Sequence, residues 1–291
     1  MNFKRQNFDD MGDIQKDLES REAARKLIPE MPVIARLDGH KFSKYTKGLN
    51  KPFDKRLQGC MQQAMMTLVK DFGADLGYTQ SDEITLVWFN RNRNQEFMFG
   101  GKIQKIVSLS AVTAANAFNL TARDNIPEKK VSAKFDCRVW QVPNDLRVLE
   151  NILWRQDDAI RNSVTMAAQS ICSHKQLMHV GHAKKLDILH EAGINWNEYN
   201  SHFKSGIFCR RFTYEATLTY EQLAKIPEQH RPKGTVERTE VFLFDMCDIR
   251  SQENTKELIE WIALKNPRVD GFLQFCSMVW GGVSDYYLAH S

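Results

Sequence analysis

The fold is decided by VIARLDG at residues 33–39 and by YTQSDEITLVWF at residues 78–89. The first stretch is a short apolar run that ends in Asp38 and a glycine. The second is a polar turn, with Asp82 and Glu83, that leads into another apolar run. Short runs of this kind, rich in β-branched residues and bounded by prolines, glycines or polar turns, predict buried strands. The sequence therefore predicts two buried strands that carry acidic residues at one end.

Helical patterns lie between and after these two strands. After Asp54, a residue type that caps helices, apolar residues recur at helical spacing up to Phe72. Further elements are predicted as a short strand at residues 76–79, a second helix at residues 102–121 and another strand at residues 133–142. The order β-α-β-β-α-β is the ferredoxin-like pattern, an α+β fold whose helices cover one face of the sheet.

This topology brings distant acidic residues together. Right-handed crossovers place the first and third strands of such a unit side by side, so the end of the first strand meets the start of the third. Asp38 lies at that end, and Asp82 and Glu83 lie at that start. We therefore expect the three carboxylates to be neighbours, although residues 39–81 separate them in the sequence.

Carboxylates gathered at one sheet edge suit divalent-cation chemistry. Mg²⁺ prefers carboxylate, water and phosphate oxygens, and two ions roughly 4 Å apart neutralise the attacking and leaving oxygens of nucleotidyl transfer. Asp38 and Asp82 can share such a pair of ions, and Gly39 lets its backbone carbonyl approach one of them. Ser81 can hydrogen-bond a phosphate or a ribose. The pattern favours a two-metal nucleotidyl-transfer site on a sheet like the palm of polymerases.

A simpler interpretation of each motif stays open. Asp-Gly is a common turn pair, and Asp82 and Glu83 can form a solvated hairpin tip. Lys102 and Lys105 open the second helix, where free backbone N–H groups favour a triphosphate, but two lysines there can equally be surface residues. The placement of both acidic motifs in one β-α-β-β-α-β unit favours the site.

Composition excludes several classes of protein. The 291 residues carry a net charge of only +4, so the chain is no generally basic nucleic-acid coat, and any RNA surface is local. The six cysteines form no CxxC pair, which disfavours a zinc site or a disulfide framework and fits a reducing cytosol. Residues 1–10 lack the apolar core of a signal peptide, and residues 271–283 are too short to span a bilayer. We therefore expect a cytoplasmic protein that does not enter a membrane.

Several stretches together resemble the tRNA(His) guanylyltransferase family, the reverse (3′-to-5′) polymerases, over about residues 31–211. The matching pieces, in the same order and spacing, are ARLDGHKF at 35–42, KPFD at 51–54, YTQSDE at 78–83, FDCRV at 135–139, WRQDD at 154–158 and GINWN at 193–197. Residues 212–291 have no place in this resemblance.

The resemblance implies a chemistry. Asp38, the carbonyl of Gly39 and Asp82 would hold two Mg²⁺ ions, with Glu83 beside them as a further catalytic acid. ATP would activate a tRNA 5′-monophosphate by adenylylation, and the 3′-hydroxyl of an incoming nucleotide, usually GTP, would then attack it. The family resemblance also implies a homotetramer or homodimer. Implied nucleotide or triphosphate contacts are His40, Lys41, Phe42, Lys51, Ser81, Lys102, Lys105 and Lys185, and implied tRNA contacts are Arg155, Gln156, Asn162 and Lys204.

The sequence changes character after Pro143, which predicts an organisation in two parts. Residues 1–143 are expected to form a palm-like catalytic domain with an N-terminal helix. Residues 144–291 are expected to form an added α/β lobe with tRNA-contacting helices and C-terminal strands. No linker separates the two parts, so the lobe is not expected to be a clean second domain.

The chain departs from the family pattern at three places, one of which is FKSG at residues 203–206, where the family has a basic-glycine pattern. The family's glycine between Asp136 and Arg138 is Cys137 here. The eukaryotic branch carries His-Ile-Asn-Asn after the Arg-Gln stretch, a segment associated with reading tRNA identity, whereas residues 160–163 here read IRNS. This difference favours the guanylyltransferase-like branch, which adds templated nucleotides to repair truncated tRNA 5′ ends, over histidine-tRNA marking.

Two other classes of function stay open. One is a palm-domain cyclase, or another two-metal nucleotidyltransferase that does not act on tRNA, which the matches at residues 51–52 and 154–156 disfavour. The other is an inactive RNA-binding palm scaffold. The joint presence of Asp38, Asp82 and Glu83 disfavours a scaffold.

Overall fold

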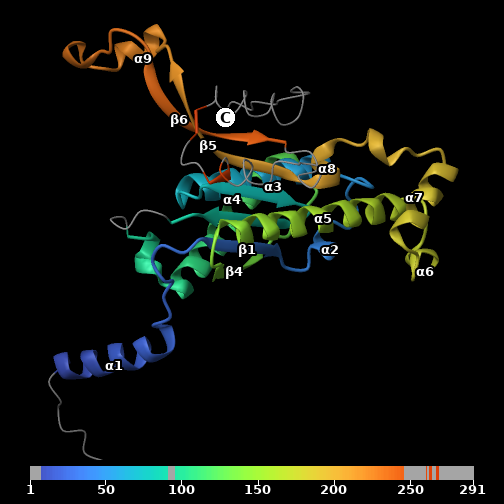
Figure 1. Cartoon of the computed structure of the whole chain (residues 1–291), viewed down its shortest axis with the longest axis horizontal. Coiled ribbons are helices and arrows are strands. Elements are labelled where there is room, and N and C mark those ends of the chain that lie inside the picture. Colours follow the sequence, from blue (N-terminus) through green and yellow to red (C-terminus); the bar gives the residue numbers. More distant parts are fainter. Residues whose placement is uncertain (1–7, 91–95, 246–259, 261, 264–266, 269–291) are drawn as a thin grey trace, which may run out of the picture.

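A six-stranded antiparallel sheet forms the centre of the computed structural model, with strand order β4-β1-β3-β2-β5-β6 (Figure 1). The structure describes residues 8–90, 96–245, 260, 262–263 and 267–268. The strands are β1 (Val33–Gly39), β2 (Leu76–Gln80), β3 (Glu83–Trp88), β4 (Phe135–Gln141), β5 (Ile207–Ala216) and β6 (Val236–Phe244).

The β-α-β-β-α-β unit has the predicted topology. β1 lies between β3 and β4 and is antiparallel to both. Helices α3 (Lys55–Asp71) and α4 (Ile103–Asn125) pack against each other over one face of the sheet. Asp54 caps α3 as predicted, since its side chain accepts a hydrogen bond of 2.9 Å from the Arg56 amide. The predicted α+β, ferredoxin-like class is confirmed.

The central strands β1 and β3 are largely apolar because both of their faces are covered. Ala35 and Leu37 of β1 join the apolar cluster beneath α3 and α4. Ile34, the residue before Ala35, points to the other face and packs in a second cluster with Val87 of β3 and residues of α5 (Asp145–Gln169). A strand buried on both faces has a nearly continuous apolar sequence rather than alternating apolar and polar residues. This is why these strands could be predicted from the sequence.

Residues after 143 extend the same sheet rather than forming a separate one. β5 pairs with the outer edge of β2, β6 pairs with β5, and the two strands lead away from the body towards α9 (Figure 1). The sequence also predicts a helix at residues 255–264, and this segment lies almost entirely outside the described residues. The remaining helices are α1 (Phe8–Ala23), α2 (Phe42–Tyr45), α6 (His174–Leu177), α7 (His182–Glu191), α8 (Ser201–Ser205), α9 (Tyr220–Ala224) and the 3₁₀ helices Met98–Gly101, Trp196–Glu198 and Glu228–His230.

Helix α1 stands away from the sheet (Figure 1). It is the N-terminal helix that the sequence predicts, and it ends at Ala23. Within the part of the chain that the structure describes, no helix is long and apolar enough to cross a membrane.

A close contact joins the end of α8 to the middle of β2. The Tyr78 side chain is 1% exposed, and its hydroxyl donates a hydrogen bond of 2.7 Å to the Ser205 carbonyl. Gly206 has a φ of +80°, and a Cβ there would lie 2.6 Å from the Tyr78 ring. Both the backbone conformation and the lack of space require glycine at this position.

We predict that Gly206→Ala destabilises the fold, because alanine would need a strained φ and would push against a buried ring. The expected loss in free energy of unfolding is about 1–3 kcal/mol from the backbone alone, and more with the clash. Urea denaturation measures it. Gly234→Ala is the control, since a Cβ at Gly234 has no heavy atom within 4 Å. Equal stability of the two variants would contradict the prediction.

Candidate active site

The structure brings the acidic residues together where β1 ends and β3 begins. Asp38 is the register partner of Glu83 across the two strands. One step further, the Gly39 amide donates a hydrogen bond of 3.0 Å to the Asp82 carbonyl. The expected meeting of the three acids follows from this antiparallel pairing.

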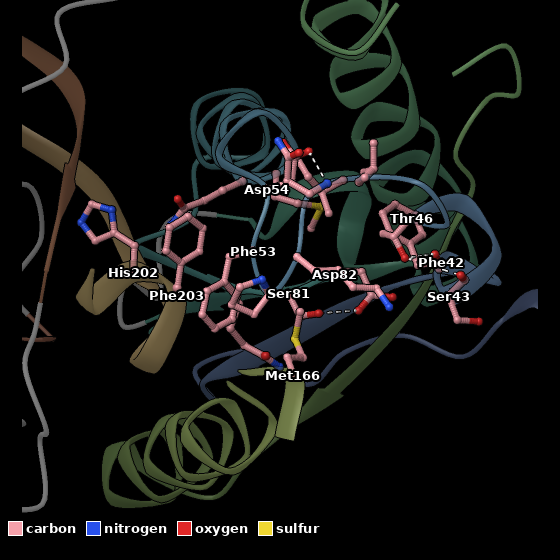
Figure 2. A pocket seen from close by; sticks show the side chains of 18 of the residues that line it. Phe42, Ser43, Thr46, Phe53, Asp54, Ser81, Asp82, Met166, His202 and Phe203 are labelled. Carbon is pink, nitrogen blue, oxygen red and sulfur yellow. Dashed lines mark hydrogen bonds between the residues drawn. The ribbon is translucent and has the colours of Figure 1, made fainter. Parts of the chain in front are cut away.

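Asp82 lies in an electrostatically unfavourable place for a lone carboxylate. Its pKa is raised above the ordinary range, first by burial and then by the negative charge of Asp38. The Ser81 hydroxyl donates a hydrogen bond of 3.1 Å to one Asp82 oxygen and offsets part of this cost (Figure 2). A cation placed beside the two aspartates would remove their repulsion.

The donor set fits Mg²⁺ that is shared with a bound nucleotide. Asp38 and Asp82 supply hard carboxylate oxygens, and Gly39 supplies a backbone carbonyl on the same strand end. Among the described residues, no three His, Cys, Asp or Glu side chains gather into a group that could hold an ion. Mg²⁺ commonly binds through one or two carboxylates and completes its shell with water and substrate phosphates, so a smaller protein donor set is sufficient.

Glycine is required at position 39 for a steric reason as well. A side chain at this position would collide with the ring of Phe42, which packs against the Gly39 backbone. Phe42 is 3% exposed and stacks near Tyr45 and Phe118 in the core. The predicted nucleotide contact at Phe42 is therefore chiefly a core residue that forms an inner wall of the site.

The Glu83 carboxylate forms ion pairs with two arginine side chains. Arg155 of α5 contacts its two carboxylate oxygens at 2.6 and 2.8 Å, and Arg36 lies 4.0 Å away. Burial raises the pKa of Glu83, and the Arg155 charge acts against that rise. The pair ties α5 to the sheet directly beside the two aspartates.

A cavity of about 640 Å³ opens next to the acidic edge. Its walls come from the loop before α3, from α3 itself, from the end of β2 and from α5 and α8 (Figure 2). This volume falls in the range of small-molecule sites. Four residues predicted for the site line it, namely Phe42, Lys51, Ser81 and Asp82.

Comparison with known proteins agrees with this geometry. The family model described as tRNA(His) guanylyltransferase matches residues 15–143. A solved structure of a bacterial tRNA(His) guanylyltransferase-like protein in complex with ATP is 32% identical, with a TM-score of 0.68, over 86% of this chain and 98% of that one. The chain belongs to the tRNA(His) guanylyltransferase family. Membership identifies it as a nucleotidyltransferase.

Other relatives of the family extend the likeness. A bacterial guanylyltransferase-like protein in complex with GTP is 28% identical with a TM-score of 0.68, over 88% of this chain and 100% of that one. An uncharacterized protein of Acanthamoeba polyphaga mimivirus is 27% identical over 69% of this chain and 77% of its own length. The tRNA(His) guanylyltransferase of Schizosaccharomyces pombe is 32% identical over 49% of this chain and 55% of its own.

Two of the predicted tRNA contacts are buried in this member of the family. Arg155 is 6% exposed and Gln156 is 1% exposed, so neither can meet RNA at the surface. The prediction failed because the helical segment at residues 154–158 was not assigned a buried face. Asn162 is exposed on α5, and Lys204 lies 5.2 Å over the Trp196 ring and donates a hydrogen bond to the Asn197 carbonyl; their tRNA contacts stay predictions.

Lys102 and Lys105 lie at the opposite end of the sheet. β3 runs away from the acidic edge, so α4, which follows it, begins at the far end. The backbone of Lys102 forms an isolated antiparallel β-bridge with that of Lys26 there, and the Lys105 ammonium lies 5.0 Å over the Phe99 ring. Within a single chain these two lysines therefore lie away from Asp38 and Asp82, and their triphosphate contacts stay a prediction.

The other predicted nucleotide contacts lie around the site rather than in the cavity. His40 and Lys41 are exposed directly after β1, and Lys41 has a φ of 55° where the chain turns into α2. Lys185 of α7 donates a hydrogen bond of 3.1 Å to the Thr165 hydroxyl of α5. None of the three lines the cavity.

Sequence reasoning missed part of the cavity wall. Phe53 and Phe203 stack against each other there, and Met166 of α5 lies near them (Figure 2). Phe53 stands inside the family-like KPFD piece, but nothing in the spacing indicates that α8 folds back onto it.

Asp54 holds the loop that carries Lys51. Its carboxylate accepts hydrogen bonds from the Asn50 amide at 3.1 Å and from the Arg56 amide and guanidinium at 2.8–3.1 Å. The hydrogen-bonded Arg56 side chain lowers the pKa of Asp54 from 3.8 to about 2. Arg56 also forms an ion pair of 2.8 Å with Glu128, so the loop is fastened to the segment after α4.

We predict that Asp54→Asn destabilises the protein in a pH-dependent way. A carboxyl whose pKa falls on folding adds stability above its ordinary pKa and loses that contribution as the pH drops through the folded value. The difference in unfolding free energy between wild type and variant should be full above about pH 4 and should shrink as the pH falls towards 2. Asp71→Asn, at the exposed end of α3, is the control. A difference that does not depend on pH would contradict the assignment.

We also predict that Arg155→Ala lowers the free energy of unfolding by about 3–5 kcal/mol, because it leaves the buried Glu83 carboxylate without its partner. Urea denaturation measures the loss. Arg161→Ala, on the exposed side of the same helix, should change stability by less than about 1 kcal/mol. A stable Arg155→Ala protein that only binds tRNA less tightly would restore the RNA-contact role.

Proposed function

We propose that this member of the family is a Mg²⁺-dependent nucleotidyltransferase that extends the 5′ end of tRNA in the 3′-to-5′ direction, with GTP the favoured nucleotide. The observation that carries the proposal is the meeting of Asp38 and Gly39 with Asp82, the one of the three that lines a nucleotide-sized cavity. The relatives of similar architecture that bind ATP and GTP support it.

The residues of the chain suggest a division of roles. Bound Mg²⁺ ions would supply positive charge to the phosphates at Asp38 and Asp82. Ser81, exposed beside Asp82, offers a hydroxyl to a phosphate or ribose, and Lys51, exposed on the cavity rim, offers a positive charge. Fixed charges and donors of this kind stabilise the negative charge that develops during phosphoryl transfer.

The proposed reaction has two steps. The 5′-monophosphate of tRNA attacks the α-phosphate of ATP, so that an adenylylated 5′ end forms and pyrophosphate leaves. The 3′-hydroxyl of the incoming GTP then attacks the activated 5′-phosphate and displaces AMP. Both steps are in-line displacements at phosphorus, so one arrangement of carboxylates can serve both.

We further propose that the substrates are truncated tRNAs rather than histidine tRNA alone. Residues 160–163 on α5 read IRNS in place of the His-Ile-Asn-Asn segment of the eukaryotic branch, and Asn162 and Arg161 are exposed there. We place the enzyme in the cytoplasm as a homotetramer or homodimer.

The test is extension of a labelled, 5′-monophosphorylated tRNA that lacks its first nucleotide, with ATP, GTP and Mg²⁺. Wild type should give a product longer at the 5′ end. Asp38→Ala and Asp82→Ala should each reduce the rate by at least about 100-fold, as expected when charge stabilisation is lost. Asp71→Ala, a solvent-exposed aspartate on α3, should leave the rate unchanged.

The template strand separates the two kinds of substrate. If addition follows the base opposite the missing position, the enzyme repairs 5′ ends. If only guanine on histidine tRNA is added, it marks that tRNA. No extension and no adenylylated intermediate with several tRNAs would overturn the proposal, and Mg²⁺-dependent GTP binding would then favour a cyclase over an inactive scaffold.

A further inference from the structure

Two aromatic rings from distant parts of the chain form one wall of the cavity. The rings of Phe53 and Phe203 stack with centroids 4.8 Å apart and planes 8° from parallel. Tyr199 meets the Phe53 ring nearly at right angles, at 5.2 Å and 83°. Phe53 belongs to the loop before α3, and Phe203 belongs to α8. The stack therefore joins these two elements of the cavity wall.

Core packing does not account for this pair. Neither Phe53 nor Phe203 belongs to the three apolar clusters formed by the described residues. Both rings are only half-buried, and both line the cavity. Figure 2 shows them on the side where Ser81 and Met166 also lie. The cavity therefore presents aromatic surface close to its phosphate-binding edge.

The arrangement suits a nucleobase. Every base has a flat π-face that stacks on aromatic side chains with little sequence preference, and larger bases cover more of the ring. A nucleotide whose phosphates lie at Ser81 and Asp82 would carry its base into the part of the cavity that these rings border. The cavity volume of about 640 Å³ is larger than the phosphates alone require.

We propose that Phe53 is the stacking platform for the base of the bound nucleoside triphosphate, and that Phe203 holds the platform in orientation. Phe53 is then a residue that determines a preference for purines, and Phe203 is a positioning residue. This inference rests on the proposed function, because it takes a nucleotide as the ligand of the cavity. It makes α8, in the second half of the chain, part of nucleotide recognition.

Calorimetric binding tests the proposal, with GTP, CTP and inorganic tripolyphosphate each titrated in the presence of Mg²⁺. Phe53→Ala should weaken GTP binding by about 5- to 150-fold, the range expected for loss of one base–aromatic stack. Tripolyphosphate, which has no base, should bind both proteins equally. Phe53→Trp should bind GTP within about threefold of wild type, because indole offers an equal or larger π-face.

Two further variants test whether the effect of Phe53→Ala comes only from a loss of folding. Phe53→Leu keeps an apolar side chain without a π-face and should reduce the ratio of GTP to CTP affinity. Phe203→Leu should change that ratio in the same direction by a smaller factor. Phe72→Leu, a half-buried phenylalanine outside the cavity that meets Phe99 edge-on at 6.2 Å, is the control and should leave the ratio unchanged.

The outcomes separate this inference from the proposed function. Wild-type GTP binding and tRNA extension together with an unchanged GTP to CTP ratio in Phe53→Leu would overturn the platform alone. Equal weakening of GTP and tripolyphosphate in Phe53→Ala would show a merely structural role and would also overturn it. No binding of any nucleotide by the wild type, with no tRNA extension, would overturn both proposals.

Discussion

The amide of Gly39 donates to the carbonyl of Asp82, and this hydrogen bond extends the pairing of β1 with β3 to the acidic edge. The pairing fixes Asp38 opposite Glu83 and places Asp82 one residue beyond. Everything else in the site is arranged around this edge. α3 and α4 cover one face of the paired strands, α5 covers the other, and the cavity opens where the strands end. A rigid strand end is a suitable place for carboxylates that must hold their positions while charge builds up on a substrate.

The concentration of acids has an electrostatic cost that the fold offsets with arginine. Three carboxylates crowd one sheet edge, and burial raises the pKa of both Asp82 and Glu83. Arg155 neutralises Glu83 from α5, which leaves the two aspartates as a pair whose repulsion a bound cation would relieve. One acid therefore serves the stability of the fold, while its neighbours keep an unmet affinity for positive charge.

Much of this arrangement could be predicted from the sequence. The strands at residues 33–39 and 83–88 were identifiable because apolar runs bounded by turns leave few alternatives, and strand order then followed from chain connectivity. Side-chain exposure was harder. Arg155 and Gln156 sit in a family-like motif, yet only the packing of α5 on the sheet shows that they are buried. Lys102 and Lys105 open α4 as expected, and the direction of β3 puts that helix start at the end of the sheet away from the acids. The Phe53–Phe203 stack depends on how α8 folds back, which no local pattern records.

Because the two strand ends are hydrogen-bonded directly, the spacing of the carboxylates and the shape of the cavity wall can change independently in evolution. The distance between Asp38 and Asp82 is set by the β1–β3 ladder, so the length of the chain that connects them has no effect on it. Residues gained or lost in the loop before α3 would reshape the cavity wall, including the ring at Phe53, while the carboxylates kept their spacing. Nucleotide preference can therefore drift or be redesigned by loop exchange in a scaffold whose reaction geometry is inherited unchanged.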